Sequence, residues 1–341
     1  AHALAPSDPS VLSELVAALE RAGLHRTACE RLEGAPPGAL DGSFVLRYLL
    51  GWNTAMTGDL TALRAQAPAL RPSTDDERFM ATRLEGLLVR AEAARAAGAL
   101  DDRDLRGWHF VINGGLLLHV SPHGLEEPMR GRYAFVQDQA ALCREGIERA
   151  RLALTAAGLP LERVLVLPER SNQILGLAAA RVLDVPAVSW EEGHDGSGLV
   201  VAYDLEALDD DLYRAVRPHR PGQVLWSHAS RWTADQPIAP DLVTFLYQFN
   251  TPPWGEQLGV DPAQGGSRRS EPDASPAEDV AERIAAAPLE ADALHDMDAL
   301  RAFVAACARV TDDEHAGGAW RASGLRRKQW AGGPVPSARF A

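Results

Sequence analysis

The chain has 341 residues, of which 46% are hydrophobic and 24% charged, so it has enough apolar material for one large domain or two smaller ones. Its formal net charge of −13 argues against a nucleic-acid partner, because binding to a phosphate backbone requires a concentrated positive field. The single lysine, Lys328, argues against a Walker-type phosphate loop, a Schiff-base enzyme and a protein kinase, since each needs a lysine at a defined place.

The three cysteines, Cys29, Cys143 and Cys307, lie far apart, and each falls in a segment with helical spacing. Dispersed cysteines in odd number favour neither a disulfide framework nor a cysteine metal knuckle, so we expect buried thiols in a reducing compartment. No segment approaches the ~18 uninterrupted apolar residues of a membrane span, and the first residues lack a basic-then-apolar signal. The composition therefore predicts a cytoplasmic protein with no membrane association and no metal site.

Residues 1–100 are predicted to form a helical domain. Apolar residues recur at helical spacing in four segments, and serine or acidic residues at the starts and glycines near the ends mark their limits. The four segments are 10–19, 40–57, 59–66 and 75–97. Trp52, Gly58 and the break at 68–72 hint at a degenerate helical repeat of roughly 34 residues, which stays open beside an ordinary helical domain.

Residues 101–258 are predicted to form an α/β domain. Trp108–Asn113 and Leu116–Val120 are apolar runs on either side of Gly114-Gly115, a pattern typical of an antiparallel β-hairpin. After a polar loop, Ala134–Ala157 has the pattern of one long amphipathic helix that ends at a glycine. We therefore expect a hairpin beside the main sheet.

From Val164 onward, short apolar runs alternate with helical segments. Such runs are typical of strands buried on both faces of a parallel sheet. The expected strands are 164–167, a run around Val188, 199–202 and 223–227, and the expected helices are 174–183 and 208–216. Whether Leu242–Phe249 is strand or helix, and whether 242–254 forms a lid, stay open. The predicted fold class is a doubly wound, mainly parallel α/β sheet with an antiparallel hairpin.

Residues 259–276 are predicted to be a linker, because the stretch is rich in glycine, serine, proline and charge and poor in apolar residues. Residues 277–341 then form a helical C-terminal segment, with helices expected at 276–287 and 291–310. The glycine-rich stretch from Thr311 is expected either to wrap a neighbouring surface or to be loose.

Ligands of doubly wound sheets bind beyond the carboxyl ends of the strands, which places three loops of this chain in one candidate crevice. The loops are Glu169–Gln173, Glu191–Gly198 and Tyr203–Glu206. The candidate ligand-binding residues are Glu169, Arg170, Ser171, Asn172, Gln173, Glu191, Glu192, Tyr203 and Asp204. The sequence leaves the catalytic residues, and any cofactor, unknown.

Each of these loops also has a purely structural interpretation. Asp209–Asp211 is typical of a helix N-terminus, and Glu169 with Arg170 is typical of a surface ion pair. The acidic loop at 191–198 fits a solvated turn as well as a mobile acid–base or metal-binding loop.

The order strand, short polar loop, helix, strand, then the run Leu199–Asp204 before another helix resembles the core of type I phosphoribosyltransferases over about residues 134–230. Arg170–Leu175 is similar to the arginine and Asn-Gln turn of competence-associated members of that family. The resemblance implies one set of contacts to pyrophosphate and one to ribose hydroxyls. These are Arg170, Ser171 and Asn172 for pyrophosphate and Asp204 for the ribose.

The second loop departs from the family pattern. Tyr203 stands where the family has the first of two acidic residues, and Leu205–Leu208 replaces the small threonine- and glycine-rich loop that holds the 5′-phosphate. A phosphate cradle needs unobstructed backbone N–H groups at a positive helix end. Glu206 and Asp209–Asp211 instead place negative charge there, which favours the helix and repels phosphate. The pattern predicts a degenerate phosphate-binding loop.

The remaining polar motifs exclude several activities. His119 and His123 are four residues apart, but Pro122 prevents the continuous helix of a zinc motif, so a metal site shared with His109 across the hairpin is the alternative that stays open. Two further histidines lack an evident carboxylate partner: His219 and His228. The chain has neither a glycine-rich dinucleotide fingerprint nor a nucleophile elbow, which argues against the commonest oxidoreductases and hydrolases.

Two functional hypotheses follow from these patterns. In the first, a degenerate, non-catalytic phosphoribosyltransferase-like protein acts in protein interaction, with a nucleotide or phosphosugar crevice retained beside that role. In the second, an active transferase or hydrolase acts on a phosphorylated nucleoside or sugar. The expected partners are a nucleotide or phosphosugar and a protein, either another protein or a second copy of this chain.

Overall fold

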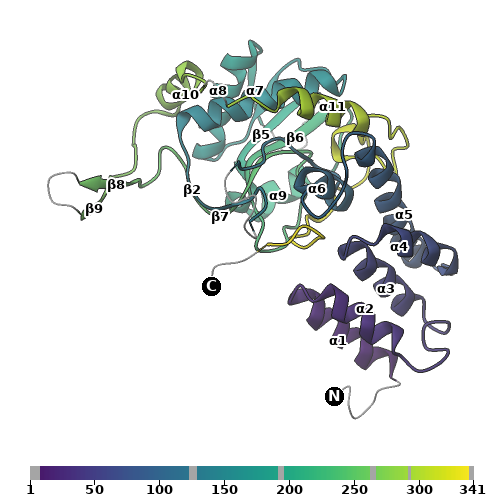
Figure 1. Cartoon of the computed structure of the whole chain (residues 1–341). Helices are drawn as coiled ribbons and strands as arrows, with labels where there is room; N and C mark the ends of the chain where they lie inside the picture. The colour runs from purple at the N-terminus through teal and green to yellow at the C-terminus, as the bar shows by residue number, and fades with distance from the viewer. Residues whose placement is uncertain (1–7, 123–128, 191–195, 262–265, 291–292, 338–341) are drawn as a thin grey trace.

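The N-terminal part of the chain is a stack of helices (Figure 1). The computed structural model describes residues 8–122, 129–190, 196–261, 266–290 and 293–337. The first helices are α1 (Pro9–Arg21), α2 (His25–Glu33), α3 (Phe44–Met56), α4 (Leu60–Gln66), the 3-10 helix η1 (Ala67–Ala69) and α5 (Asp75–Arg95). α5 begins with a capping box, in which the Thr74 hydroxyl and the Glu77 carboxylate each accept a backbone N–H of the other residue. The four predicted helices are confirmed, and α2 is an additional one.

A seven-stranded sheet lies at the centre of the rest of the chain. Its strands are β1 (Leu116–Leu117), β2 (Tyr133–Gln137), β3 (Val164–Val166), β4 (Ala187–Ser189), β5 (Gly198–Asp204), β6 (Gln223–Arg231) and β7 (Leu242–Thr251). Their order is β4-β3-β5-β6-β7, and β1 and β2 both pair with the outer edge of β7. Every pairing in this sheet is parallel. The predicted α/β fold is confirmed, and Leu242–Phe249 belongs to a strand.

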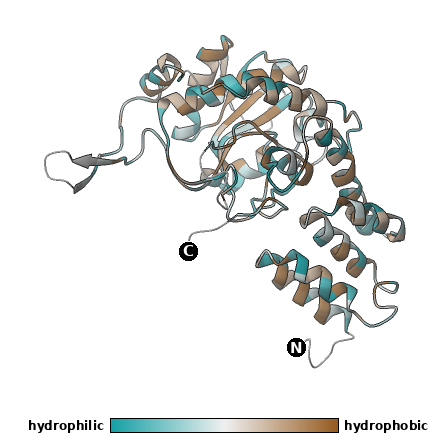
Figure 2. Ribbon diagram, in the orientation of Figure 1, coloured by the Kyte–Doolittle hydropathy of each residue, from teal (hydrophilic) through white to brown (hydrophobic). Residues whose placement is uncertain are grey.

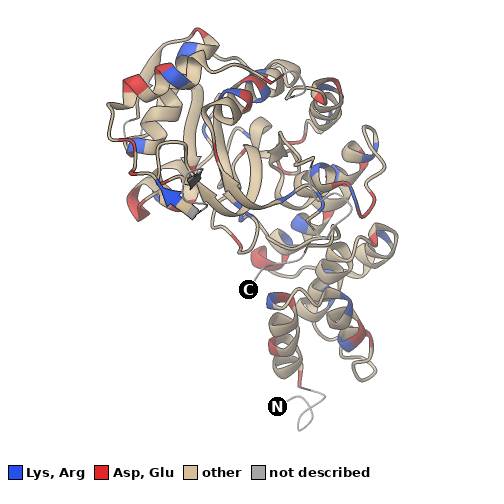
Figure 3. Ribbon diagram, turned by 60° about the vertical axis from the view of Figure 1, so that its left-hand side comes forward, with Lys and Arg blue, Asp and Glu red and all other residues tan. Residues whose placement is uncertain are grey.

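Helices cover both faces of the sheet, and its interior strands are hydrophobic and almost free of charge (Figures 2 and 3). On one face lie α7 (Ala140–Ala156), α8 (Arg170–Leu183) and α10 (Ala277–Ala286), with α11 (Met297–Cys307) packed against α7; on the other lie the 3-10 helix η2 (Leu205–Ala207) and α9 (Asp210–Val216). Successive strand residues alternate between the faces, so Val200 and Val201 enter different cores. Among the described residues, no helix combines the length and apolarity that a bilayer crossing requires.

The prediction of a β-hairpin at 108–120 is wrong. Leu105–Asn113 forms a helix, α6, whose first turn is capped by Asp104: its carboxylate accepts the Gly107 N–H at 2.8 Å. Gly114 ends the helix with a positive φ of 76°, a backbone conformation that glycine adopts without strain. All residues of α6 except Arg106 are buried, so the apolar run reflects a helix enclosed by protein rather than a strand.

An antiparallel hairpin is found instead at residues 258–269, which except for Leu258 belong to the predicted linker at 259–276. It consists of β8 (Leu258–Asp261) and β9 (Gly266–Arg269) and projects from the body of the molecule (Figure 1). The stretch is poor in apolar residues because the hairpin buries little surface against the domain.

The prediction of one long helix at 134–157 is also wrong, because the segment contains a strand followed by a shorter helix. Tyr133–Gln137 forms β2, and α7 starts only at Ala140, after Gln139 in an extended conformation. β2 pairs with the second half of β7, which places Phe135 beside Phe249. A strand of five residues is too short to show its period of two against a following helix, which explains the error.

The chain after α11 packs against the core. Of the two alternatives for the stretch from Thr311, the one in which it wraps a neighbouring surface is therefore confirmed. Past the 3-10 helix η3 (Gly318–Trp320), the Arg326 guanidinium donates to the Asp241 carboxylate at 2.8 Å, and both side chains are buried. Trp330 then packs on Trp52 of α3, with ring centroids 5.0 Å apart. These contacts join the helical stack to the α/β domain.

Candidate functional site at the carboxyl edge of the sheet

The sheet has a topological switch point between β3 and β5. β4 follows β3 in sequence and pairs on its outer side, whereas β5 pairs on the inner side. Ligands of doubly wound sheets bind outside the carboxyl ends of the two strands at such a point. The predicted loop residues lie at this point but mostly in regular structure: Glu169 precedes α8, Arg170–Gln173 form its first turn, and Tyr203 and Asp204 end β5. Glu191 and Glu192 lie outside the described residues.

At the end of β3, the chain's own carboxylate occupies the helix N-terminus where an anion would bind. Glu169 is the N-cap of α8, and its Oε2 accepts the backbone N–H groups of Ser171 at 2.8 Å and Asn172 at 3.1 Å. Free N–H groups at a helix start are what a phosphate needs. Here the carboxylate already satisfies them.

The other predicted anion contacts are also engaged within the protein. Arg170 donates from Nη2 to the backbone carbonyls of Asp273 at 2.8 Å and Ser275 at 2.9 Å, rather than pairing with Glu169. The Ser171 hydroxyl accepts from the indole N–H of Trp254 at 3.1 Å. The neighbouring Gln173 is exposed. The segment that follows β7 is therefore hydrogen-bonded to the first turn of α8.

After β5, too, carboxylates of the chain itself accept the backbone N–H groups. The Asp204 Oδ1 accepts the Glu206 N–H at 3.0 Å, and the Asp209 Oδ1 accepts the Leu212 N–H at 2.8 Å, so the prediction that the aspartates cap a helix is confirmed. Glu206 in turn forms an ion pair with Arg231 at 2.9 Å. The backbone groups and the charge that would hold a phosphate are thus occupied by carboxylates.

Burial changes the ionisation of Asp204. Loss of water around the carboxyl group raises its pKa to about 6, although the carboxylate accepts a hydrogen bond from the Tyr247 hydroxyl. The ordinary pKa of an aspartate is near 4. Asp204 therefore gains a proton within a pH range in which exposed aspartates remain charged.

Behind these residues lies a polar cluster that consists of Asp138, Cys143, Asn172, Tyr203, His228 and Asn250. All of its members except the partly exposed Asn250 are buried. The Tyr203 hydroxyl donates to Oδ2 of Asp138 at 2.9 Å and accepts from Nδ2 of Asn250 at 3.0 Å. The Tyr203 backbone N–H donates to Oδ1 of Asn172 at 2.8 Å. Two predicted ligand-binding residues, Asn172 and Tyr203, thus bind each other in the interior instead of facing solvent.

The sequence patterns point to none of the other four members of this cluster as site residues. Asp138 lies in the stretch predicted to be helical, and Asn250 lies in the segment for which a lid stays open. Cys143 is expected only to be buried, and His228 to lack an evident carboxylate partner. His228 Nε2 lies 3.2 Å from Asp138 Oδ2, and Cys143 Sγ lies 3.4 Å from the same oxygen. The only local signal was Gln-Asp-Gln at 137–139, a polar break between apolar runs. The partners come from elements far apart in sequence.

His219, the second histidine for which the sequence shows no evident carboxylate partner, also lies near a carboxylate. His219 Nδ1 lies 3.9 Å from Asp241 Oδ1 in the interior. Burial lowers the pKa of His219 to about 4, so the ring is neutral near pH 7.

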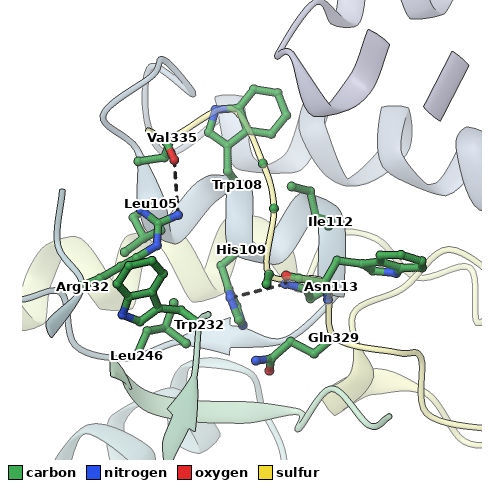
Figure 4. Close-up of a pocket in the computed structure, with 14 residues that line it drawn as sticks. Leu105, Trp108, His109, Ile112, Asn113, Arg132, Trp232, Leu246, Gln329 and Val335 are labelled. Atoms are coloured by element: carbon green, nitrogen blue, oxygen red, sulfur yellow. Dashed lines mark hydrogen bonds between the residues drawn. The ribbon is translucent and has the colours of Figure 1, made fainter. Parts of the chain in front are cut away.

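Figure 4 shows a small cavity where α6 meets the C-terminal segment. Its volume is about 30 Å³, and His109, Asn113 and Gln329 are among the residues that line it. His109 Nε2 and Gln329 Oε1 are buried there without a hydrogen-bond partner, and burial lowers the pKa of His109 to about 4. The volume and the two polar atoms suit one ordered water molecule, not an organic ligand.

A larger cleft of about 580 Å³ lies between the helical stack and the C-terminal segment. Trp52 and Trp330 line it, together with Glu20 and an ion pair between Lys328 and Asp235 at 2.8 Å. The cleft has the volume of a small-molecule site. Its charges are of both signs and partly paired with one another, so they do not point to one class of ligand.

Exposed apolar side chains gather at the other end of the carboxyl edge, beside β2 and β7. Phe135 is 56% exposed and Phe249 is 59% exposed, and the two are in register on paired strands. Leu258, at the start of β8, is 49% exposed, and its N–H donates to the Gln137 side chain of β2 at 3.0 Å. We refer to Phe135, Phe249 and Leu258 as the apolar edge.

No protein-family model matches the chain, and no match was found among curated proteins or among solved structures. The functional assignment therefore relies on the geometry of the site.

Proposed function

We propose that this protein is a degenerate, non-catalytic relative of the phosphoribosyltransferase-like fold that acts by binding another protein. One observation supports this most strongly: on both sides of the switch point, the helix starts are capped by the chain's own carboxylates, Glu169 and Asp209. A phosphorylated substrate would have to displace these carboxylates and would meet their negative charge. Transfer chemistry at this crevice is therefore disfavoured.

The apolar edge supports the interaction role. Phe135, Phe249 and Leu258 expose large side chains at one place, and burial of such residues against a partner is the main favourable term in protein association. β2 is the last strand on this side of the sheet in the described part of the chain, the position in a sheet at which a partner strand can add. The proposed partner is a protein with an apolar surface that docks on this edge.

Affinity capture from an extract of the native host tests this proposal. The bait proteins are the wild-type chain, the double variant Phe135→Asp/Phe249→Asp, and the control Phe79→Asp, which changes a side chain that is 75% exposed on α5, away from the apolar edge. We expect wild type and control to recover the same partner and the double variant to recover at least about 10-fold less, because interface aromatics often contribute more than about 1.4 kcal/mol each. Equal recovery by all three baits contradicts the proposal.

The alternative, an active transferase or hydrolase on a phosphorylated nucleoside or sugar, makes a different prediction. It requires that such a ligand stabilise the wild-type protein and that Arg170→Ala abolish the stabilisation. The present proposal expects no stabilisation of the wild-type protein by nucleotides, phosphosugars or pyrophosphate.

A further inference from the structure

Three chemically different metal-binding groups meet in the interior of the α/β domain. Asp138 follows β2, Cys143 lies in the first turn of α7, and His228 lies in β6. The Asp138 Oδ2 is 3.2 Å from His228 Nε2 and 3.4 Å from Cys143 Sγ, and the three donor atoms all lie within 4.8 Å of one another. All three side chains are buried.

Hydrogen bonds alone do not satisfy this cluster. The Tyr203 hydroxyl donates to the same Oδ2 at 2.9 Å, so three hydrogen-bearing groups crowd one carboxylate oxygen that has about two lone-pair positions. Both ring nitrogens of His228 are buried without a partner in hydrogen-bonding geometry. Buried polar atoms are rarely left in this state, which indicates that another species completes the cluster.

We propose that Asp138, Cys143 and His228 bind a divalent transition-metal ion, with zinc as the best match. Zinc is bound by thiolate, imidazole and carboxylate at about 2.0–2.3 Å, which in a tetrahedral site places neighbouring donor atoms about 3.3–3.7 Å apart. The separations of 3.2 and 3.4 Å at Asp138 Oδ2 are close to these values. A thiolate ligand disfavours magnesium and calcium, which prefer oxygen donors.

The charges of the site balance. Two positive charges on the ion meet one negative charge on the Asp138 carboxylate and one on the Cys143 thiolate, while His228 contributes a neutral imidazole, so the buried centre carries no net charge. Binding releases the thiol proton of Cys143 to solvent, which metal coordination drives. A neutral centre avoids the large cost of placing an unpaired charge in the protein interior.

The surroundings hold the ligands in place. The Tyr203 hydroxyl orients the Asp138 carboxylate and is itself held by Asn250 at 3.0 Å, an arrangement typical of the groups around a bound metal. Gly146 of α7 faces His228: a Cβ atom at this position would lie only 2.6 Å from His228 Nδ1. The helix thus approaches the ring so closely that only glycine fits.

Cobalt titration of the full chain under reducing conditions tests the site. We expect one Co²⁺ per chain, visible d–d absorption of a four-coordinate ion and a sulfur-to-cobalt charge-transfer band, with displacement of the cobalt by zinc. Cys143→Ser and His228→Ala should each lower the affinity by more than about 100-fold, since even residues around the ligands contribute about 10–100-fold. Gly146→Ala should weaken binding although it removes no ligand.

A second variant keeps the test decisive if a ligand substitution prevents folding. Cys29→Ser/Cys307→Ala leaves Cys143 as the chain's only cysteine without touching the cluster. We expect this variant to retain the sulfur-to-cobalt band in full, which assigns the band to Cys143. Absence of stoichiometric cobalt and zinc binding in the folded wild-type protein, or loss of the band in this variant while it remains folded, would overturn the proposal.

Discussion

The two ends of the carboxyl edge of this sheet differ in which side chains they expose to solvent and which they pair within the protein. At the switch point between β3 and β5, the Glu169 carboxylate and the Arg170 guanidinium are paired with groups of the chain itself. At the β2–β7 end, large apolar side chains such as Phe135 and Phe249 remain exposed. We expect substitutions in the first region to change stability and substitutions in the second to change binding to the proposed partner.

The largest effect on stability is expected from Asn172→Ala. The substitution removes the acceptor of the buried Tyr203 N–H and leaves a small cavity, so we expect a loss of about 2–3 kcal/mol in the free energy of unfolding. Gln173→Ala, at the exposed neighbouring position, is the control and should stay within about 0.5 kcal/mol. Urea denaturation measures both; equal effects would show that the switch point is not a stability element.

The next effect is expected from Asp204→Asn and has a defined pH dependence. Burial raises the pKa of the folded-state carboxyl group to about 6, above its ordinary value of 3.8, so its contribution to stability is most favourable below about pH 4 and declines as the pH rises to about 6. The asparagine side chain of the variant cannot ionise, so the variant should be more stable than wild type by about 1–2 kcal/mol at pH 7 and equal or less stable at pH 4.

Denaturation curves at several pH values check this sign. His109 and His219 act in the opposite direction, because burial lowers the pKa of each to about 4 and the wild-type protein loses their contribution as the pH falls from about 6.5 to 4. The Asp204→Asn variant should therefore lose stability more steeply on acidification than wild type. A parallel pair of curves would contradict the raised pKa of Asp204.

A smaller effect on stability, with a gain of binding, is expected from Glu169→Ala. Loss of the N-cap should cost about 1 kcal/mol and expose the N–H groups of Ser171 and Asn172. Sulfate or phosphate should then stabilise the variant more than the wild-type protein. Thermal denaturation with increasing phosphate, with chloride at matched ionic strength as the control, measures the difference. Equal stabilisation of both proteins would mean that Glu169 does not occupy an anion position.

The smallest effect on stability is expected at the apolar edge. Phe135→Asp/Phe249→Asp should change the free energy of unfolding by less than about 1 kcal/mol, because both rings are more than half exposed. The same variant should show the largest loss of partner recovery. A large loss of stability would instead assign these rings to the core.

The sequence patterns predicted the sheet from β3 to β6 because apolar runs and the caps of α8 and α9 are local signals. They failed at α6, whose aromatic and β-branched side chains are of the types enriched in strands, and at β2, which is too short to show a period of two. For the site, they placed Glu169–Gln173 in a loop after β3, whereas Arg170 already begins α8 and only Glu169 precedes it. The sequence patterns could not predict that Asp138 lies beside Cys143 and His228. The end of β2, the start of α7 and β6 are brought together only by the order of the strands in the folded sheet.

We propose that the switch point between β3 and β5 is closed to phosphorylated ligands. Calorimetric titration of the wild-type protein with phosphoribosyl pyrophosphate and magnesium tests it most directly, since this ligand carries both groups that the family resemblance implies. We predict no saturable heat of binding, because the chain's carboxylates occupy the helix starts after β3 and β5. Saturable binding in the wild-type protein that is lost in Arg170→Ala would contradict the account.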